Sequence, residues 1–237
     1  MLGKIAARLG HGVDVSATYL YLFQGESPVT YVASSPFPGR KAKTLPRWML
    51  IVTTVLSVAV ALVSLRYFFP AVPMPPSIKA NAFRNPWLLI HVVGAATALL
   101  LGPAQFFPRL RARFPVQHRW TGRAYVLGCM VGGVSGLMLA VGTSTGNIST
   151  VGFASLALAW LVSTVLAWRR AVQRRLVDHQ AWMIRSFALT LAAVTLRIYL
   201  PLSGLLPFSF ETSYQAISFL CWVPNMVLAE LYLRWRG

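Results

Sequence analysis

The sequence predicts an all-α membrane protein, a polytopic bundle of six transmembrane helices with both ends in the cytoplasm (N-in/C-in). Two observations lead to this fold class. The composition is 56% hydrophobic and only 11% charged, with a mean hydropathy of +0.60, which is unlike an ordinary soluble domain. The basic residues outside the apolar blocks also alternate from one side of the predicted bundle to the other.

The apolar residues fall into blocks long enough to cross a bilayer, which takes about 20 residues in a helix. Each block is far longer than a β-strand, and none alternates with the period of two that is typical of an outer-membrane barrel. Helices also satisfy their own backbone hydrogen bonds, which lipid cannot do for them. The predicted spans are residues 48–69, 86–107, 119–142, 150–168, 180–203 and 214–233.

The segments that connect these spans differ in charge. The leader, the turns after the second and fourth spans, and the C-terminal tail are rich in arginine and lysine. The opposite turns hold only Lys79 and Arg84 in the first, and no basic residue at 143–149 or 204–213. By the positive-inside rule both termini are cytoplasmic, and we expect a multi-pass protein of the bacterial inner membrane. The formal net charge of +17 fits a basic face against anionic lipid headgroups of the bilayer, and no motif for nucleic acid competes with that interpretation.

We expect a transmembrane domain at 48–233, flanked by two cytoplasmic segments. Residues 1–47 are a basic leader, in which LGKIAARLGHGV could form a short amphipathic helix on the inner membrane surface. The first apolar block begins too late and runs too long for a cleaved signal peptide, so we interpret it as a retained anchor. Residues 234–237 are a short tail.

The sequence lacks the motifs that would identify a known chemistry. Cys129 and Cys221 both lie inside predicted spans, where a thiol usually acts as a small apolar side chain. There is no CxxCH haem-attachment motif, no P-loop and no HExxH zinc motif. No nucleophile is paired with a recognisable base, so the sequence leaves open whether the protein is an enzyme.

Polar residues are costly inside a membrane, and one group of them gathers at the cytoplasmic side. The segments HRWTGRAYVL and HQAWMIRSFAL begin the third and fifth predicted helices, and both helices enter from that side. We therefore expect His118 and His179 at the same depth. The candidate cofactor-binding residues of this group are His118, His179, Arg119, Arg123, Arg185, Trp120 and Trp182.

This cytoplasmic group allows several interpretations. Two neutral imidazoles on separate helices could ligate the iron of a haem b, with arginines pairing its propionates. His118 and His179 are the only metal ligands that we predict, and they would serve such an iron. The same residues could instead hold a quinone head or the phosphate of an anionic lipid. In the remaining interpretation they are a belt of tryptophan and arginine at the headgroup level, where the histidines only finish helix ends.

A smaller polar group lies toward the outer side. His91 is near the outer start of the second predicted helix and Arg197 is near the outer end of the fifth, so we expect them at similar depth and close to one another. Eighteen residues at about 1.5 Å each place Arg197 roughly 27 Å from His179, which argues against one metal site for the three intramembrane histidines. Arg197 could alternatively extend to the outer headgroups.

Small residues and a proline add to the pattern. Ala95, Ala98 and Gly102 follow His91 at helical spacing, and Gly128, Gly132 and Gly136 do so in the third helix. Such ladders are typical of close helix contact, and they could also leave space for a flat cofactor. Pro224 and Asn225 predict a kink in the sixth helix with an interhelical hydrogen bond. The other polar intramembrane candidates are Asn225, Gln105 and Glu230.

Four sequence segments occur in order between Pro86 and Glu230: HVVGAATALLLGPAQF, HRWTGRAYVLG, HQAWMIRSFALTLAAVTLRIYLPL and WVPNMVLAE. Together they resemble a bacterial family of predicted multi-pass membrane proteins, domain of unknown function 2306. The resemblance implies a helical membrane fold and no activity. A looser similarity to membrane b-type cytochromes rests on helical histidines alone, and their usual histidine pairs deep in the spans are lacking here. The residues that the family resemblance highlights are His91, His118, Arg123, His179, Arg185, Arg197 and Asn225.

The sequence is compatible with three functions. The first is a membrane protein with a cofactor, quinone or lipid site near the cytoplasmic surface. The second is an accessory or assembly subunit that packs its helices against a larger membrane complex. The third is a transporter, for which charged residues in mid-span and repeated broken helices would be expected and only Pro224 with Asn225 qualifies.

Overall fold

The computed structural model describes residues 46–69 and 71–236, and its regular elements there are all helices. Six helical segments in this part of the chain are long and apolar enough to cross a membrane, which confirms the six predicted spans. The leader helix that the sequence predicts lies outside the described residues. The spans are α1 (Arg47–Ser64) with η2 (Leu65–Phe68), α3 (Arg84–Leu101) with η3 (Pro103–Phe106), α5 (Pro115–Val141), α6 (Asn147–Val172), α7 (Leu176–Thr190) with α8 (Ala192–Ser203), and α9 (Phe210–Leu220) with α10 (Val223–Arg236).

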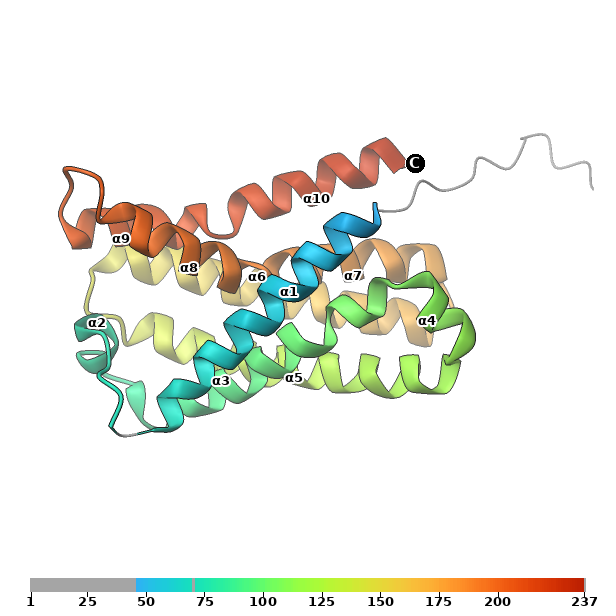
Figure 1. Cartoon of the computed structure of the whole chain (residues 1–237), viewed down its shortest axis with the longest axis horizontal. Helices are drawn as coiled ribbons and strands as arrows, with labels where there is room; N and C mark the ends of the chain where they lie inside the picture. The colour runs from blue at the N-terminus through green and yellow to red at the C-terminus, as the bar shows by residue number, and fades with distance from the viewer. Residues whose placement is uncertain (1–45, 70, 237) are drawn as a thin grey trace, which may run out of the picture. The chain divides into compact units, whose positions relative to one another are not determined.

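The helices run side by side, so that the bundle has two ends (Figure 1). One end carries the short helix α4 (Pro108–Arg113), the turn between α6 and α7, and the end of α10. The opposite end carries α2 (Pro76–Lys79) and the turns from α5 to α6 and from α8 to α9. We call the first of these the basic end, because it holds Arg109, Arg111, Arg113, Arg169, Arg170, Arg174, Arg175, Arg234 and Arg236.

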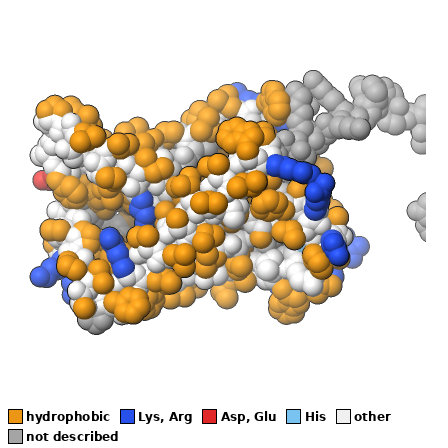
Figure 2. Space-filling model, in the orientation of Figure 1, with side chains coloured by type: hydrophobic (Ala, Val, Ile, Leu, Met, Phe, Trp, Pro, Cys, Tyr) orange, Lys and Arg blue, Asp and Glu red, His pale blue; other side chains and the backbone are white. Residues whose placement is uncertain are grey.

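The sides of the helices are apolar, as lipid contact requires. Val55, Val162 and Leu228 are each more than half exposed, at 60%, 55% and 64%, and they belong to three different spans. Figure 2 shows apolar side chains spread over the visible face of the bundle, with Lys and Arg side chains toward its two ends. A soluble domain rarely exposes apolar area on this scale, so these surfaces face lipid in a multi-pass membrane protein.

Helices α3 and α5 approach closely because glycines lie where they cross. A Cβ atom added at Gly94 would lie 2.4 Å from the backbone nitrogen of Gly132 and 2.8 Å from the carbonyl oxygen of Gly128. Real Cβ atoms do not reach such distances, so only glycine fits at Gly94. The glycine ladder that the sequence marks at 128, 132 and 136 therefore lies in a helix contact.

Two of the spans are interrupted: the fifth where the sequence predicts one continuous helix, and the sixth close to the kink that the sequence predicts at Pro224 and Asn225. The fifth span turns at Leu191 between α7 and α8, and the sixth turns at Cys221 and Trp222 between α9 and α10. Pro224 lacks the N–H that would continue the helical hydrogen bonds through the second break. Asn225 donates from Nδ2 to Thr195 Oγ1 at 2.9 Å, which joins α10 to α8 beside the break.

Candidate functional site

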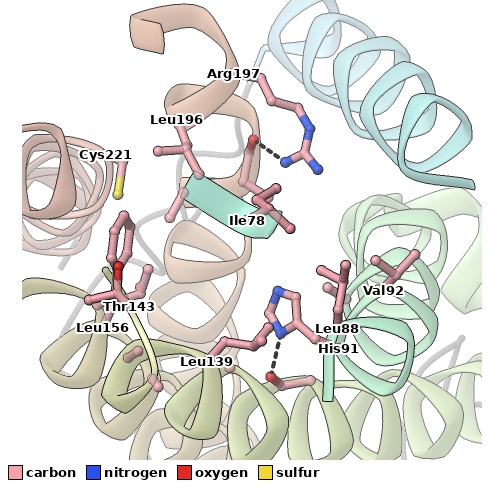
Figure 3. Close-up of a pocket in the computed structure, with 18 of the residues that line it drawn as sticks. Ile78, Leu88, His91, Val92, Leu139, Thr143, Leu156, Leu196, Arg197 and Cys221 are labelled. Atoms are coloured by element: carbon pink, nitrogen blue, oxygen red, sulfur yellow. Dashed lines mark hydrogen bonds between the residues drawn. The ribbon is translucent and has the colours of Figure 1, made fainter. Parts of the chain in front are cut away.

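A cavity lies in the half of the bundle near the end opposite the basic one. Its volume is 420 Å³, and its wall is formed by α2, η2, α3, α5, α6, α8 and α9 with the end of α7. Arg66 and Phe210 are exposed members of this wall, so the cavity reaches the molecular surface beside them. Most of the wall is apolar and includes Leu88, Leu139, Leu156 and Leu196, as the close-up shows (Figure 3).

His91 borders the cavity from α3 and is held by a backbone hydrogen bond. Its Nδ1 lies 2.8 Å from the carbonyl oxygen of Gly132 on α5, and because a carbonyl can only accept, Nδ1 carries the hydrogen. A Cβ atom at Gly136 would lie 3.1 Å from the same nitrogen, so glycine makes room for the ring. The other ring nitrogen, Nε2, points toward the open space (Figure 3).

Arg197 borders the same cavity from α8. Its Nη1 donates to the carbonyl oxygen of Ala193 at 3.0 Å, and its Nη2 donates to Ser64 Oγ at 2.7 Å, which joins α8 to α1. The ion pairs in the described part of the chain are Arg175 with Asp178 and Arg185 with Glu230, so none involves Arg197. Its positive charge is met only by neutral partners among these residues.

Arg66 adds a second guanidinium to the wall. Arg66 belongs to η2, which directly follows α1. Its Nη2 donates to the hydroxyl of Tyr67 at 3.2 Å, and its Cζ lies 5.1 Å from the centre of the Tyr67 ring. The described residues that line the cavity include Arg66, Arg197 and His91 but no aspartate or glutamate. The wall is therefore apolar with a net positive charge.

A buried hydroxyl network begins at the floor of the cavity. Thr190 belongs to the wall, and its Oγ1 lies 3.0 Å from the hydroxyl of Tyr125, which is 2.9 Å from Ser186 Oγ. Ser186 Oγ is 2.8 Å from Thr164 Oγ1, and Trp160 Nε1 donates to Thr190 Oγ1 at 3.0 Å. These side chains come from α5, α6 and α7, so the network joins three helices deep in the bundle.

The cytoplasmic group of the sequence prediction lies near the basic end, away from the cavity. His179 Nδ1 lies 2.9 Å from the carbonyl oxygen of Ala167, and this bond ties α7 to α6. His118 lines a separate small cleft with Arg111, Gln117 and other residues of η3, α4 and α5. The described residues contain no group of three or more His, Cys, Asp or Glu side chains that could hold a metal ion. Haem ligation by the two histidines stays a prediction.

The arginines of this group make contacts within the bundle. Arg185 donates from Nε and Nη2 to the two carboxylate oxygens of Glu230, and its Cζ lies 4.6 Å from the centre of the Trp182 ring. Arg123 lies 4.8 Å over the ring of Trp120. Such stacked and bidentate pairs suit the headgroup region of a membrane. Arg119 and Trp120 are exposed.

Gln105 and Asn225 bridge helices. Gln105 is buried, and its Nε2 donates to Thr121 Oγ1 at 2.9 Å, which joins η3 to α5. Asn225 donates to Thr195 Oγ1, and it also lies 3.3 Å from the carbonyl oxygen of Ala188. Both residues donate to hydroxyl or carbonyl groups of a neighbouring helix, and neither lines the cavity.

Sequence reasoning missed part of the cavity wall and the whole hydroxyl network. Arg66 did carry a signal, because it is a charged residue inside the predicted span 48–69. Tyr125, Thr164, Ser186 and Thr190 carried none, since hydroxyl side chains are common in membrane helices and bond readily to their own backbone.

Comparison with known proteins gives one result. Searches of curated proteins and of solved structures find no match. A family model described as predicted membrane protein, domain of unknown function 2306, matches residues 88–233, which is more than half of the chain and includes most of the cavity wall. The chain therefore belongs to this family of predicted membrane proteins.

Proposed function

We propose that the protein binds a membrane-soluble small molecule in the cavity between His91 and Arg197. One observation carries the proposal: a cavity of 420 Å³, apolar over most of its wall, contains a histidine and an arginine inside membrane spans. Ligand pockets typically measure about 300–1,000 Å³ and combine an apolar lining with a few polar groups that orient the ligand. The cavity has both properties.

A purely structural role for the polar residues leaves the cavity unexplained. Arg197 does join α8 to α1 through Ser64, and His91 does join α3 to α5 through Gly132. Close packing is the rule in protein interiors, and voids much larger than a water molecule are few. A bundle that needed these residues only as helix contacts would be expected to close the space between them.

The basic end gives the proposed orientation. Arginine-rich turns favour the cytoplasm, so the proposal has both termini inside and the cavity in the outer half of a bacterial inner membrane. Apolar molecules of the outer leaflet could then enter beside Arg66 and Phe210, where the wall is exposed. Binding within the outer half differs from the cytoplasmic cofactor site that the sequence suggests, and the two proposals are independent.

Binding can be tested with a neutral photoreactive probe. The full-length protein in lipid nanodiscs is titrated with a hexadecanol that carries a diazirine on its chain, and the labelled fraction is measured by mass spectrometry of the intact protein. We expect labelling of the wild type to saturate, because a cavity holds a limited number of molecules.

The control uses two variants of one helix. Leu196→Trp enlarges a side chain of the cavity wall, whereas Ile198→Trp makes an enlargement of equal size at a position 44% exposed outside the wall. We expect the first variant to lose most of the saturable labelling and the second to keep it. Labelling that rises in proportion to the probe and is equal in all three proteins would contradict the proposal.

A further inference from the structure

We infer that the head group recognised in the cavity is anionic, and that the ligand is an amphiphile with a phosphate or carboxylate head and an alkyl chain. The inference rests on the proposed function and adds the chemical class of the ligand. It comes from the charges around the cavity, from the hydrogen bonds of Arg197, and from the separation of polar and apolar parts of the wall.

The charged groups around the cavity are nearly all positive. Arg66 and Arg197 are in the wall, and Lys79 and Arg84 lie nearby at the same end of the bundle. In the described part of the chain, the acidic residue at this end of the bundle is Glu211, and it lies outside the cavity wall. Its carboxylate accepts a hydrogen bond from Gln215 Nε2 at 3.3 Å. An anion that entered the cavity would meet two guanidinium groups and no carboxylate.

Arg197 has donors left for such an anion. Guanidinium has five N–H donors, and the bonds to Ala193 and Ser64 occupy only part of this set. A charged side chain inside a membrane is costly unless it is paired or reaches water. A guanidinium can donate two parallel hydrogen bonds to two oxygens of one phosphate or carboxylate. A hydroxyl or a quinone carbonyl has only one oxygen and cannot accept such a pair.

The rest of the wall suits an alkyl chain. The α6 and α9 parts contain Phe153, Leu156 and Tyr214, and the floor beside the hydroxyl network contains Trp160 and Leu189. These side chains offer contact area and few polar atoms. The wall therefore combines a cationic part with an apolar part, which is the pattern of an amphiphile's binding site.

Three probes with one chain and different heads test the inference. They are diazirine-bearing hexadecyl phosphate, hexadecanol and hexadecyl trimethylammonium, applied to the full-length protein in nanodiscs of neutral lipid. We expect half-saturation for the phosphate at roughly tenfold lower concentration than for the alcohol, because hydrogen bonds to charged groups are the stronger ones. The ammonium probe should label the cavity least.

The variants Arg197→Gln and Arg66→Gln should each remove much of the preference for phosphate over alcohol. Lys79→Gln is the matched control, since it removes a charge from the same end but from outside the wall. The elution of each variant from a size-exclusion column and its far-ultraviolet circular dichroism monitor folding independently of ligand binding. If Arg197→Gln does not fold, the exposed Arg66→Gln variant gives the answer alone.

The outcomes separate this inference from the proposed function. Saturable labelling by all three probes with equal half-saturation would leave the proposed function standing and overturn the anionic class. Absence of saturable labelling by every probe would contradict both. Displacement of the phosphate probe by inorganic phosphate at the same concentration as the probe would show a site for the free anion and would overturn the amphiphilic class of ligand.

Discussion

At the scale of single residues, glycines determine where the polar side chain of His91 lies, because a glycine has no side chain of its own. Glycines at 94, 128 and 132 let α3 and α5 approach closely enough for His91 to reach a backbone carbonyl of the neighbouring helix. Gly136 leaves space for the imidazole ring. The position of His91 therefore depends on a helix contact, and that contact can be tested without changing the histidine.

Gly94→Ala should destabilise the protein by about 1–3 kcal/mol, the usual cost of overpacking. The new Cβ would lie 2.4 Å from a backbone nitrogen, and a helix backbone cannot move away as a flexible side chain can. Gly204→Ala is the control, because its Cβ would make an ordinary contact at 3.4 Å. The measurement is the free energy of unfolding in mixed micelles. A Gly94→Ala variant as stable as the wild type would show that α3 and α5 are further apart.

At the scale of helices, hydroxyl groups join α5, α6 and α7 through hydrogen bonds. Apolar packing alone would leave these helices free to rotate about their axes. Tyr125 from α5 bonds to Ser186 and Thr190 of α7, and Thr164 of α6 bonds to Ser186. Lipid offers no competing hydrogen bonds, so this network favours one rotation of each helix. It also supports the floor of the cavity through Thr190.

Tyr125→Phe should lower the free energy of unfolding by about 0.6 kcal/mol, the average for a hydrogen bond between membrane helices, and by no more than about 1.7 kcal/mol, the largest such value. The substitution removes a fully buried hydroxyl and keeps the ring. Tyr199→Phe is the matched control, because within the described part of the chain no hydrogen bond of the Tyr199 hydroxyl is found. Equal loss of stability in both variants would mean that the ring environment, and not the network, accounts for the effect.

The sequence predicts helices far better than it predicts their neighbours. The six spans follow from apolar blocks of about 20 residues, and the break near Pro224 follows from its missing N–H. The turn at Leu191 has no proline or glycine from which the sequence could predict it. The cavity depends on which helices surround α8 and α9, and that arrangement is set by side-chain packing over long sequence separations. His91 and Arg197 could be selected as costly polar residues, but their shared cavity wall could not be derived from spacing.

At the scale of the whole molecule, the uneven charge of the two ends predicts the orientation in the membrane. Reporter fusions at Gly146 and Gly204 should read as extracytoplasmic, and a fusion at Gln173, beside the arginines of the basic end, should read as cytoplasmic. A cytoplasmic signal at Gly146 would reverse the orientation and move the cavity to the inner half of the membrane. Binding itself would be unaffected by that result.

The map of attachment sites tests ligand binding most directly. Wild-type protein in nanodiscs is labelled with the diazirine-bearing hexadecanol at low occupancy, digested, and sequenced by mass spectrometry to locate each modified residue. We predict that the saturable label lies on cavity residues of α3, α8 and α9, including Leu88, Leu196 and Tyr214. A label found instead on lipid-facing positions such as Val55 and Leu228, with none on the cavity wall, would contradict the proposed function.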